Sequence, residues 1–249
     1  MKNELRIYPF IKELQYKLKH NDYVVDKSGV KLVEILNARI LHLNPLQPTL
    51  EFVGKKTNTK YVEKEKAWYL SQDLSIINHV DDVTIWNSCA SKDAKKEVNS
   101  NYGYLVYSKK NGNQFENVVN TLKNHKESRQ AVIIYNRPSI HHDWNDKGKR
   151  DFICTFYQHF FIRDNKLICL TNMRSNDLIF GTCNDLPWFF YVYNDVYSKL
   201  KEFYPELQVG YMDFTANSLH VYERHFETLK KIKLNRMDSI KYMFNQIIR

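Results

Sequence analysis

Side chains that can do chemistry follow one another along the second half of this 249-residue chain. They are the thiol of Cys154, the pair Arg174-Ser175, the carboxylate of Asp185, and the ring side chains of His220 and Tyr222. A thiolate is a nucleophile, and arginine with serine suits the oxygens of a phosphate. The set and its order therefore indicate nucleophilic chemistry on a nucleotide.

Taken singly, the thiol and the arginine each have a plainer explanation. Cys154 stands in Asp-Phe-Ile-Cys-Thr-Phe-Tyr, which is expected to be a strand, and a cysteine there is usually a small buried hydrophobic residue. Arg174 follows an expected strand, where a surface arginine is common. A guanidinium close to Cys154 would favour the thiolate, which is the attacking species.

Asp185 and the ring pair also have plain structural explanations. Asn184 or Asp185 followed by Pro187 is a good helix start, with a capping side chain and proline in the first turn. His220 and Tyr222 alternate along an expected strand, so both point to the same face. That face either packs or meets one ligand.

The spacing of apolar residues predicts the elements that position these side chains. Helices are expected at residues 4–20, 64–74, 115–125, 185–203, 225–233 and 237–248, and strands within 22–43 and at 131–135, 152–163, 167–171, 209–214 and 218–222. Residues 44–60 and 138–150 are expected to be loops, and Arg163-Asp-Asn-Lys166 a hairpin turn. Apolar residues on many faces make 185–203 a central helix. We expect an α+β fold with one large sheet, as a single domain over residues 1–249.

Composition limits the partners and the location. The formal net charge of +9 suits nucleic acid or small anionic ligands. The basic residues are interleaved with acidic ones and form no nucleic-acid-binding motif, which favours a basic surface that attracts a nucleotide phosphate. The four cysteines show no zinc or redox spacing, and there is no signal peptide or membrane-spanning run. We expect a cytoplasmic protein without a metal site.

Longer strings of the sequence resemble the thymidylate synthase superfamily, most closely its phage deoxycytidylate hydroxymethylase branch. The similarity runs from about Asp22 to Tyr242. The matching strings include Asp22-Tyr-Val-Val-Asp-Lys-Ser-Gly-Val-Lys31, Asn99-Ser-Asn-Tyr-Gly103, Ile134-Tyr-Asn-Arg-Pro-Ser139, Asn172-Met-Arg-Ser-Asn-Asp177 and Ser218-Leu-His-Val-Tyr-Glu-Arg-His-Phe226. The resemblance implies a thymidylate synthase-like domain in which helices pack a large mixed sheet and one sheet face lies at a dimer interface.

The resemblance also implies how a pyrimidine deoxynucleoside monophosphate is bound. Cys154 matches the nucleophile that adds to C6 of the pyrimidine. In the string Arg174-Ser175-Asn176, the first two residues match phosphate ligands, and the asparagine is expected to bind substrate as well. His220 and Tyr222 match ligands of the sugar 3′-hydroxyl.

Two further basic residues match phosphate ligands that come from outside this cluster. Lys27 stands where thymidylate synthases have a mobile phosphate-binding arginine. Arg129 matches an arginine that reaches the phosphate of the neighbouring subunit. The resemblance therefore implies a homodimer with shared active sites.

Four residues match the part of the family site that handles the folate and protons. Glu65 matches the carboxylate that organises proton-transfer waters. Trp86 and Tyr102 match residues that line the folate and nucleophile region, and Asp177 matches a contact to the pterin ring. The implied co-substrate is 5,10-methylenetetrahydrofolate.

Three positions depart from the family pattern. Gln130 replaces a second arginine, so the phosphate clamp is expected to be weaker or rearranged. Thr155 stands where synthases have histidine. His159 falls where the family has glutamine, although Gln158 is adjacent, and a β-bulge would exchange the two.

Asp185 separates the branches, because thymidylate synthases carry asparagine there. A neutral carboxylic acid offers one donor and one acceptor, the complement of the N3 and 4-amino edge of cytosine, which requires a raised pKa for Asp185. The resemblance thus implies that the chain hydroxymethylates dCMP. The alternatives are a dUMP hydroxymethylase or a thymidylate synthase on the same fold and, more distantly, a basic nucleic-acid-binding protein.

Overall fold

A seven-stranded mixed β-sheet forms the centre of the fold in the computed structural model, which describes the backbone of residues 1–247 and the side chains of residues 1–244. The helices are α1 (Asn3–Lys19), α2 (Thr59–Ser71), α3 (Thr84–Cys89), α4 (Tyr102–Tyr107), α5 (Gln114–Asn124), α6 (Ile140–Asp143), α7 (Gly181–Lys201), α8 (Phe226–Lys231) and α9 (Arg236–Ile247). The strands are β1 (Val24–Val25), β2 (Lys31–Leu43), β3 (Glu51–Phe52), β4 (Lys55–Lys56), β5 (Val132–Ile134), β6 (Thr155–Arg163), β7 (Lys166–Met173), β8 (Asn176–Asp177) and β9 (Gln208–Tyr222).

The sheet has the strand order β1-β2-β9-β7-β6-β5, and β8 pairs with β9 outside this path. Neighbouring strands are antiparallel except at β9, which runs parallel to β7 and β8. The long helix α7 lies in the connection between β7 and β9, as a parallel pair requires. β6 and β7 form the predicted hairpin, in which Arg163 pairs with Lys166. The expected α+β fold with one large mixed sheet is therefore confirmed.

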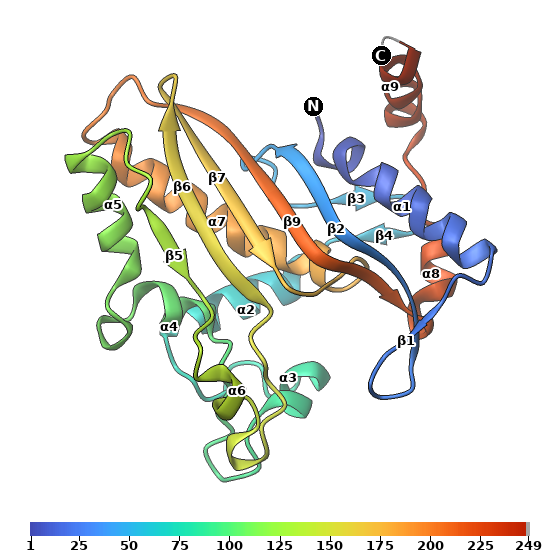
Figure 1. The fold of residues 1–249 in the computed structure, drawn as a ribbon, viewed down its shortest axis with the longest axis horizontal. Coiled ribbons are helices and arrows are strands. Elements are labelled where there is room, and N and C mark those ends of the chain that lie inside the picture. Colours follow the sequence, from blue (N-terminus) through green and yellow to red (C-terminus); the bar gives the residue numbers. More distant parts are fainter. Residues whose placement is uncertain (248–249) are drawn as a thin grey trace.

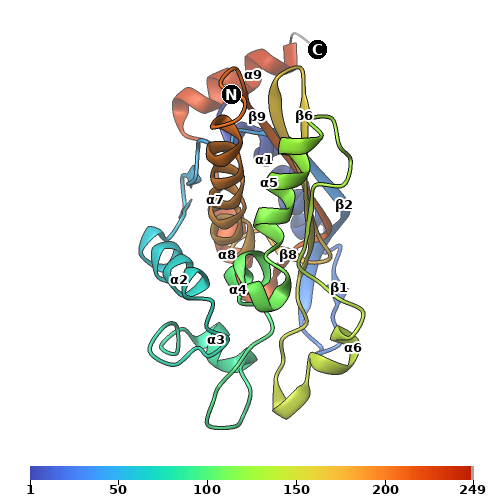
Figure 2. The ribbon, with the colours of Figure 1, turned by 90° about the vertical axis from the view of Figure 1, so that its left-hand side faces the viewer.

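Helices cover one face of the sheet. In Figure 1 the sheet lies in front of α7 and α2, and Figure 2 shows these helices on one side of the strands. α7 is buried on most of its faces, as the sequence predicts, through the side chains of Leu186, Trp188, Phe189, Phe190, Val192, Tyr193, Val196 and Leu200. Among the described residues, no helix is long and apolar enough to cross a membrane.

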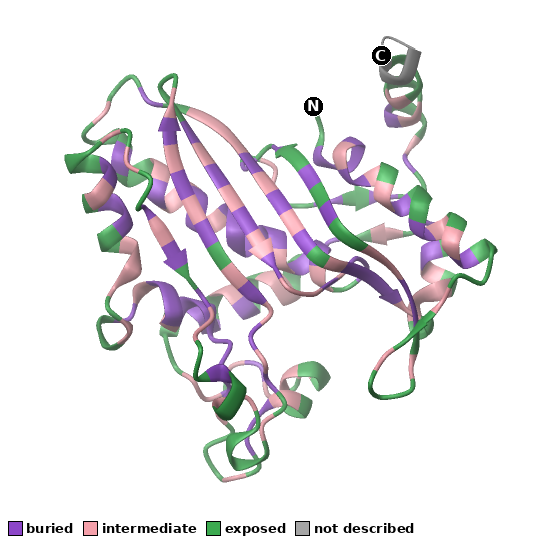
Figure 3. Cartoon of the chain, viewed as in Figure 1, coloured by how far each residue is buried: buried purple, intermediate pink, exposed green. Residues whose placement is uncertain are grey.

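The other face of the sheet stays open in the described part of the chain, and it is rich in apolar and aromatic side chains. The strand register places Ile134 opposite Tyr157 and Phe161 opposite Ile168 on this face. Ile134 is 54% exposed and Tyr157 is 36% exposed. Figure 3 shows the alternation of buried and accessible residues along β6, β7 and β9. We call this surface the open sheet face.

Several element boundaries differ from the prediction. The two strands expected at 209–214 and 218–222 are one strand, β9, because β2 pairs with it across the gap at Thr215 and Ala216. α2 begins five positions earlier than expected, at Thr59. The expected loops contain β3, β4 and α6, and α3 and α4 were not predicted. Residue 248 of the last expected helix lies outside the described residues.

An irregularity in β6 decides which of two neighbouring side chains enters the core. Thr155 pairs with Met173 and Tyr157 with Asn172, so two steps on β6 match one step on β7. This bulge turns Gln158 inward. Gln158 is fully buried and accepts a hydrogen bond from the hydroxyl of Tyr135 at 2.7 Å. The β-bulge that would exchange Gln158 and His159 is therefore present, and Gln158 rather than His159 takes the inner position.

Candidate active site

One large pocket, of about 1030 Å³, opens where β6, β7 and β9 meet the N-terminal end of α7 and the helices α2 and α3. Twelve of the thirteen predicted site residues line it: Lys27, Glu65, Trp86, Tyr102, Cys154, Arg174, Ser175, Asn176, Asp177, Asp185, His220 and Tyr222. They come from segments far apart in the sequence. The fold therefore brings together in one pocket residues that are far apart in the sequence.

Cys154 lies directly before β6, so the expectation that it sits within a strand is wrong. Its Sγ is 3.4 Å from Nη2 of Arg174. Burial raises the pKa of Cys154 to about 11, and the charge of Arg174 opposes that rise without overcoming it. The guanidinium therefore lies beside the sulfur, but it does not make the thiolate the main form at neutral pH, as the sequence analysis expected of a nearby guanidinium.

Arg174 also fixes the backbone on which the thiol is carried. Its Nη2 donates to the carbonyl oxygen of Phe152 at 2.6 Å, and its Nε donates to that of Ile153 at 3.1 Å. The guanidinium lies 4.9 Å from the centre of the Phe152 ring. Since these contacts use only part of the guanidinium fork, the same side chain can hold an anion in the pocket.

Asp185 does not begin a helix. α7 starts at Gly181, so Asp185 lies in its second turn and Pro187 lies inside the helix, and the capping explanation is wrong. Asp177 turns the chain ahead of the helix, because its Oδ1 accepts from the backbone N–H of Ile179 and Phe180 at 2.7 and 3.0 Å. The carboxyl group of Asp185 is thereby free to face the pocket.

The pKa of Asp185 is raised well above its usual range, mainly by burial and then by the charge of Glu65. Oδ2 of Asp185 accepts a hydrogen bond from Nδ2 of Asn176 at 2.8 Å. This bond lowers the pKa but does not cancel the rise. The structure therefore supports the neutral carboxyl group that reading a cytosine edge requires.

Glu65 belongs to a hydrogen-bonded cluster in the same pocket. The hydroxyl of Tyr61 donates to Oε1 of Glu65, and Nε1 of Trp86 lies 3.0 Å from both that hydroxyl and Oε1. Burial raises the pKa of Glu65 to about 7, and hydrogen bonds with Tyr61, Trp86 and Tyr69 limit the rise. A carboxyl group with such a pKa can give or take a proton near neutral pH.

His220 and Tyr222 point into the pocket from the end of β9, as their alternation predicts. Their rings meet edge to face with centroids 4.8 Å apart. Burial lowers the pKa of His220, so its imidazole is neutral at pH 7. Lys27 and Trp144 also line the pocket, and Nζ of Lys27 lies 5.1 Å from the centre of the Trp144 ring.

Arg129 is the predicted site residue that the fold does not bring into this pocket. It is exposed on the segment before β5, and its carbonyl oxygen lies 2.9 Å from Nε2 of His159. His159 pairs with Leu170 across the hairpin and belongs to the open sheet face. Arg129 thus lies beside that face, away from its own chain's thiol.

The sequence analysis missed three residues that shape the site. Tyr61 contacts Glu65, four positions on, from the same side of α2, a spacing that would have revealed the pair. Asp151 is buried and accepts from the backbone N–H of Asn99 and Ser100, which no local pattern announces. Thr182 donates to Asn176.

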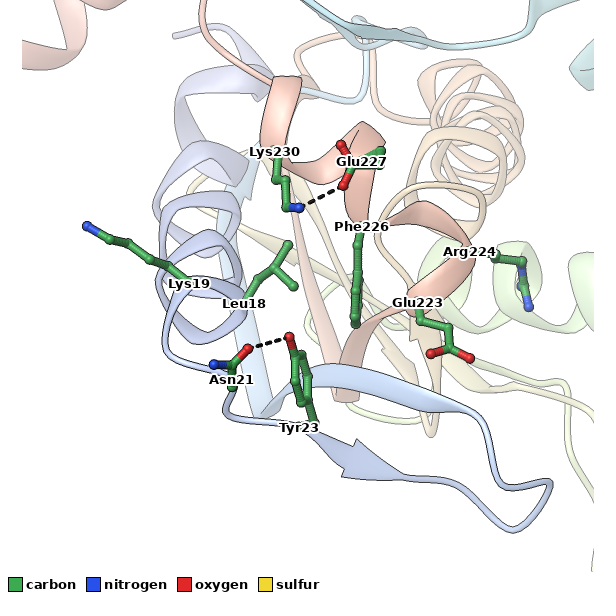
Figure 4. A pocket seen from close by; sticks show the side chains of 9 residues that line it. All are labelled: Leu18, Lys19, Asn21, Tyr23, Glu223, Arg224, Phe226, Glu227 and Lys230. Atoms are coloured by element: carbon green, nitrogen blue, oxygen red, sulfur yellow. Dashed lines mark hydrogen bonds and ion pairs between the residues drawn. The ribbon is translucent and has the colours of Figure 1, made fainter.

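A second hollow, of about 800 Å³, lies between α1, β1 and α8 (Figure 4). Tyr23 and Phe226 stack there with ring centroids 5.6 Å apart. Lys230 pairs with Glu227 at 2.7 Å on its rim. The hollow contains neither a thiol nor a buried carboxyl group, so the chemistry belongs to the first pocket.

Comparison with known proteins agrees with this geometry. The family model of thymidylate synthase matches residues 10–244, nearly the whole chain. The chain belongs to the thymidylate synthase family. Among curated relatives it is 38% identical over 212 residues to the deoxycytidylate 5-hydroxymethyltransferase of Enterobacteria phage T6. It is 37% identical to the enzymes of the same name from phages T4 and T2, and each match covers 84% of this chain and 83% of the relative.

Proposed function

We propose that the chain is a deoxycytidylate 5-hydroxymethyltransferase, which converts dCMP, 5,10-methylenetetrahydrofolate and water to 5-hydroxymethyl-dCMP and tetrahydrofolate in the cytoplasm. The observation that carries the proposal is the half-buried carboxyl group of Asp185, whose pKa is raised and which lies in the same pocket as the thiol of Cys154. The names of the phage relatives support the same reaction.

Cys154 performs the covalent step. Its sulfur adds to C6 of the pyrimidine, and the electron pair of the C5–C6 double bond makes C5 nucleophilic. C5 attacks the methylene carbon of the folate, and a C–C bond forms. Loss of the C5 proton then breaks the C–N bond to the folate, so that tetrahydrofolate leaves and an exocyclic methylene remains. Water adds to this carbon and the C6–S bond breaks, which returns the thiol. Glu65 lies in the same pocket and moves protons to and from ordered water during these steps.

The base is read by Asp185. As a neutral acid, it donates to N3 of cytosine with its hydroxyl group and accepts from the 4-amino group with its carbonyl oxygen. Uracil presents an N3–H donor and an O4 acceptor, so both contacts would be mispaired. Each mispaired buried polar group costs about 1–3 kcal/mol, which corresponds to a preference for dCMP of roughly tenfold to several hundredfold.

The phosphate and sugar are held by the basic and polar side chains of the pocket. Arg174 and Ser175 bind the phosphate, together with Lys27 from the β1–β2 loop. His220 and Tyr222 bind the 3′-hydroxyl. Their presence in the lining of the pocket that contains Cys154 and Asp185 supports these roles.

The pocket also suits a folate. Oδ2 of Asp177 is buried and has no hydrogen-bond partner among the described residues; its nearest cation is Nη2 of Arg224, at 3.8 Å, so it can accept from the N–H groups of a pterin ring. The rings of Trp86 and Phe180 line the same pocket and suit a flat heterocycle. Trp86, Asp177 and Tyr102 would hold the co-substrate.

Two copies of the chain would form the working enzyme. The open sheet face carries apolar side chains that a second copy would bury. Arg129 lies beside this face and away from its own pocket, which supports its assignment to the phosphate of the partner's site. The homodimer would therefore share its active sites.

The direct test is release of tritium from C5 of labelled dCMP and dUMP, with and without 5,10-methylenetetrahydrofolate, with analysis of the product. Folate-dependent release from dCMP that yields 5-hydroxymethyl-dCMP supports the proposal. Release from dUMP alone, with a methyl or hydroxymethyl product, assigns the chain to the uracil-specific alternatives. No release, together with salt-dependent binding to random DNA, would assign it to nucleic-acid binding.

A further inference from the structure

A chain of hydrogen bonds runs behind the carboxyl group of Asp185. The hydroxyl of Thr182 donates to Oδ1 of Asn176, and Nδ2 of Asn176 donates to Oδ2 of Asp185 at 2.8 Å. Thr182 is fully buried, and Asn176 is 2% exposed. We call these three residues the Thr–Asn–Asp chain.

Backbone pairing and close packing hold the Thr–Asn–Asp chain in one arrangement. Asn176 lies in β8 and pairs with Leu219 of β9. Thr182 and Asp185 are three positions apart on α7, so they share one side of the helix. A Cβ atom at Gly181 would lie only 2.9 Å from Nδ2 of Asn176 and 3.1 Å from Oδ2 of Asp185. Gly181 has no positive φ, so glycine is needed there for space.

The chemistry of the groups decides the direction of each hydrogen bond. An amide oxygen only accepts and an amide nitrogen only donates. The hydroxyl of Thr182 could donate or accept, but the thioether of Met173 can only accept, and Nδ2 of Asn176 lies 3.3 Å from its sulfur. The amide nitrogen is therefore the atom that faces Asp185, and the amide oxygen accepts from Thr182. The carboxyl oxygen beside Asn176 must then accept. In a neutral carboxyl group the carbonyl oxygen is the better acceptor, so the proton belongs on the other oxygen, Oδ1.

We propose that Thr182 and Asn176 are specificity-determining residues that hold the proton of Asp185 on Oδ1. The inference rests on the proposed function, because it takes Asp185 as the group that faces the base. With the proton on Oδ1, Asp185 presents its donor and acceptor in one fixed order, which fits cytosine. Uracil requires the proton on the oxygen beside Asn176. Rotation of the carboxyl group does not make it complementary to uracil, because whichever oxygen then lies against Asn176 must accept the hydrogen bond from Nδ2.

The test removes the hydroxyl group of Thr182 and nothing else of its shape. In Thr182→Val the amide of Asn176 loses its orientation and can turn its oxygen toward Asp185. The ratio of kcat/KM for dCMP to that for dUMP should fall about three- to tenfold, the effect of weakening one buried hydrogen bond. Thr182→Ser keeps a hydroxyl group and should restore the ratio.

Two further variants separate positioning from general stability. Gly181→Ala pushes the pair apart without removing a polar group and should lower the same ratio. Thr171→Val removes another buried threonine hydroxyl, on β7 and outside the pocket, so it should lower the melting temperature but not the ratio. If Thr182→Val cannot be purified, the same test compares Gly181→Ala with Thr171→Val: only Gly181→Ala should lower the ratio of kcat/KM for dCMP to that for dUMP.

The dissociation constants of dCMP and dUMP, measured by calorimetry, separate this inference from the proposed function. One outcome would overturn the inference alone. The wild-type protein makes 5-hydroxymethyl-dCMP, and Thr182→Val and Gly181→Ala change neither the ratio of kcat/KM values nor the ratio of dissociation constants for the two nucleotides. A wild-type protein without turnover, for which Thr182→Val lowers the ratio of the dissociation constant of dUMP to that of dCMP, would support the inference and overturn the proposed reaction.

Discussion

Tyr61→Phe should shift the pH dependence of the reaction toward higher pH. The hydroxyl of Tyr61 donates to Oε1 of Glu65 and stabilises the charged carboxylate. Burial already raises the pKa of Glu65 to about 7, and this hydrogen bond is the largest influence that opposes the rise. Without it the charged form is less stable, so the pKa of Glu65 must increase further.

The size of the shift follows from the contacts that remain. A hydrogen bond to a charged group contributes about 1.5–3 kcal/mol, and one pKa unit corresponds to about 1.4 kcal/mol. Nε1 of Trp86 donates to both the Tyr61 hydroxyl and Oε1 of Glu65, each at 3.0 Å. In Tyr61→Phe it donates to Glu65 alone, so it restores part of the stabilisation that the carboxylate loses. We expect the pKa of Glu65 to rise by about one unit, to roughly 8.

The assay is kcat/KM for tritium release from C5 of dCMP across the pH range in which the enzyme stays folded. The limb that Glu65→Gln abolishes is assigned to Glu65, and in Tyr61→Phe this limb should move up by about one unit. Tyr107→Phe is the matched control, because it removes a hydroxyl that donates to the carboxylate of Asp195 at 2.8 Å, outside the pocket. A limb that moves equally in both variants, or in neither, would refute the reasoning.

Three further outcomes are expected. Alkylation of Cys154 by iodoacetamide, followed by peptide mass spectrometry, should accelerate about tenfold per pH unit from neutral pH upward, since burial raises the pKa of Cys154 to about 11; a plateau below pH ~9 would contradict this. The contribution of Asp185 to stability should fall as pH rises above about 4, where the unfolded chain loses the Asp185 proton that the folded protein retains. Asp185→Asn should therefore gain melting temperature relative to wild type between pH 5 and 8, and a constant difference would mean equal pKa values in both states. Mixing inactive Cys154→Ser with inactive Arg129→Ala should restore activity through subunit exchange, which a fully active monomer would exclude.

Sequence reasoning succeeded where chemistry and periodicity agreed. The hairpin of β6 and β7 and the buried helix α7 follow from apolar patterns and turn residues, and both are present. The common face of His220 and Tyr222 follows from a two-residue spacing alone. The prediction that these residues share a site with Cys154 came from the family resemblance, because no local sequence pattern indicates which strand ends lie together.

The failures have physical causes. Pro187 suggested a helix start, but the turn formed by Asp177 begins α7 at Gly181, and the following turns bury enough apolar surface to accommodate the proline. The sequence analysis expected a guanidinium near Cys154 to favour the thiolate, but burial in the fold raises the pKa of the thiol more than Arg174 lowers it, and no spacing encodes that burial. Asp151 was missed because its partners lie about fifty positions away.

The pairing of β2 with β9 limits the order in which parts of the chain can fold during synthesis. The hairpin of β6 and β7 closes over a short turn, so the side that carries Cys154 can form soon after synthesis. Glu34 and Ser218 are 184 positions apart, so β2 must wait for almost the whole chain before its partner exists. Until then β2 and β7 present unpaired edges, which favour aggregation. A nascent chain therefore has no nucleotide pocket, and truncation before β9 should yield insoluble fragments rather than a weakened enzyme.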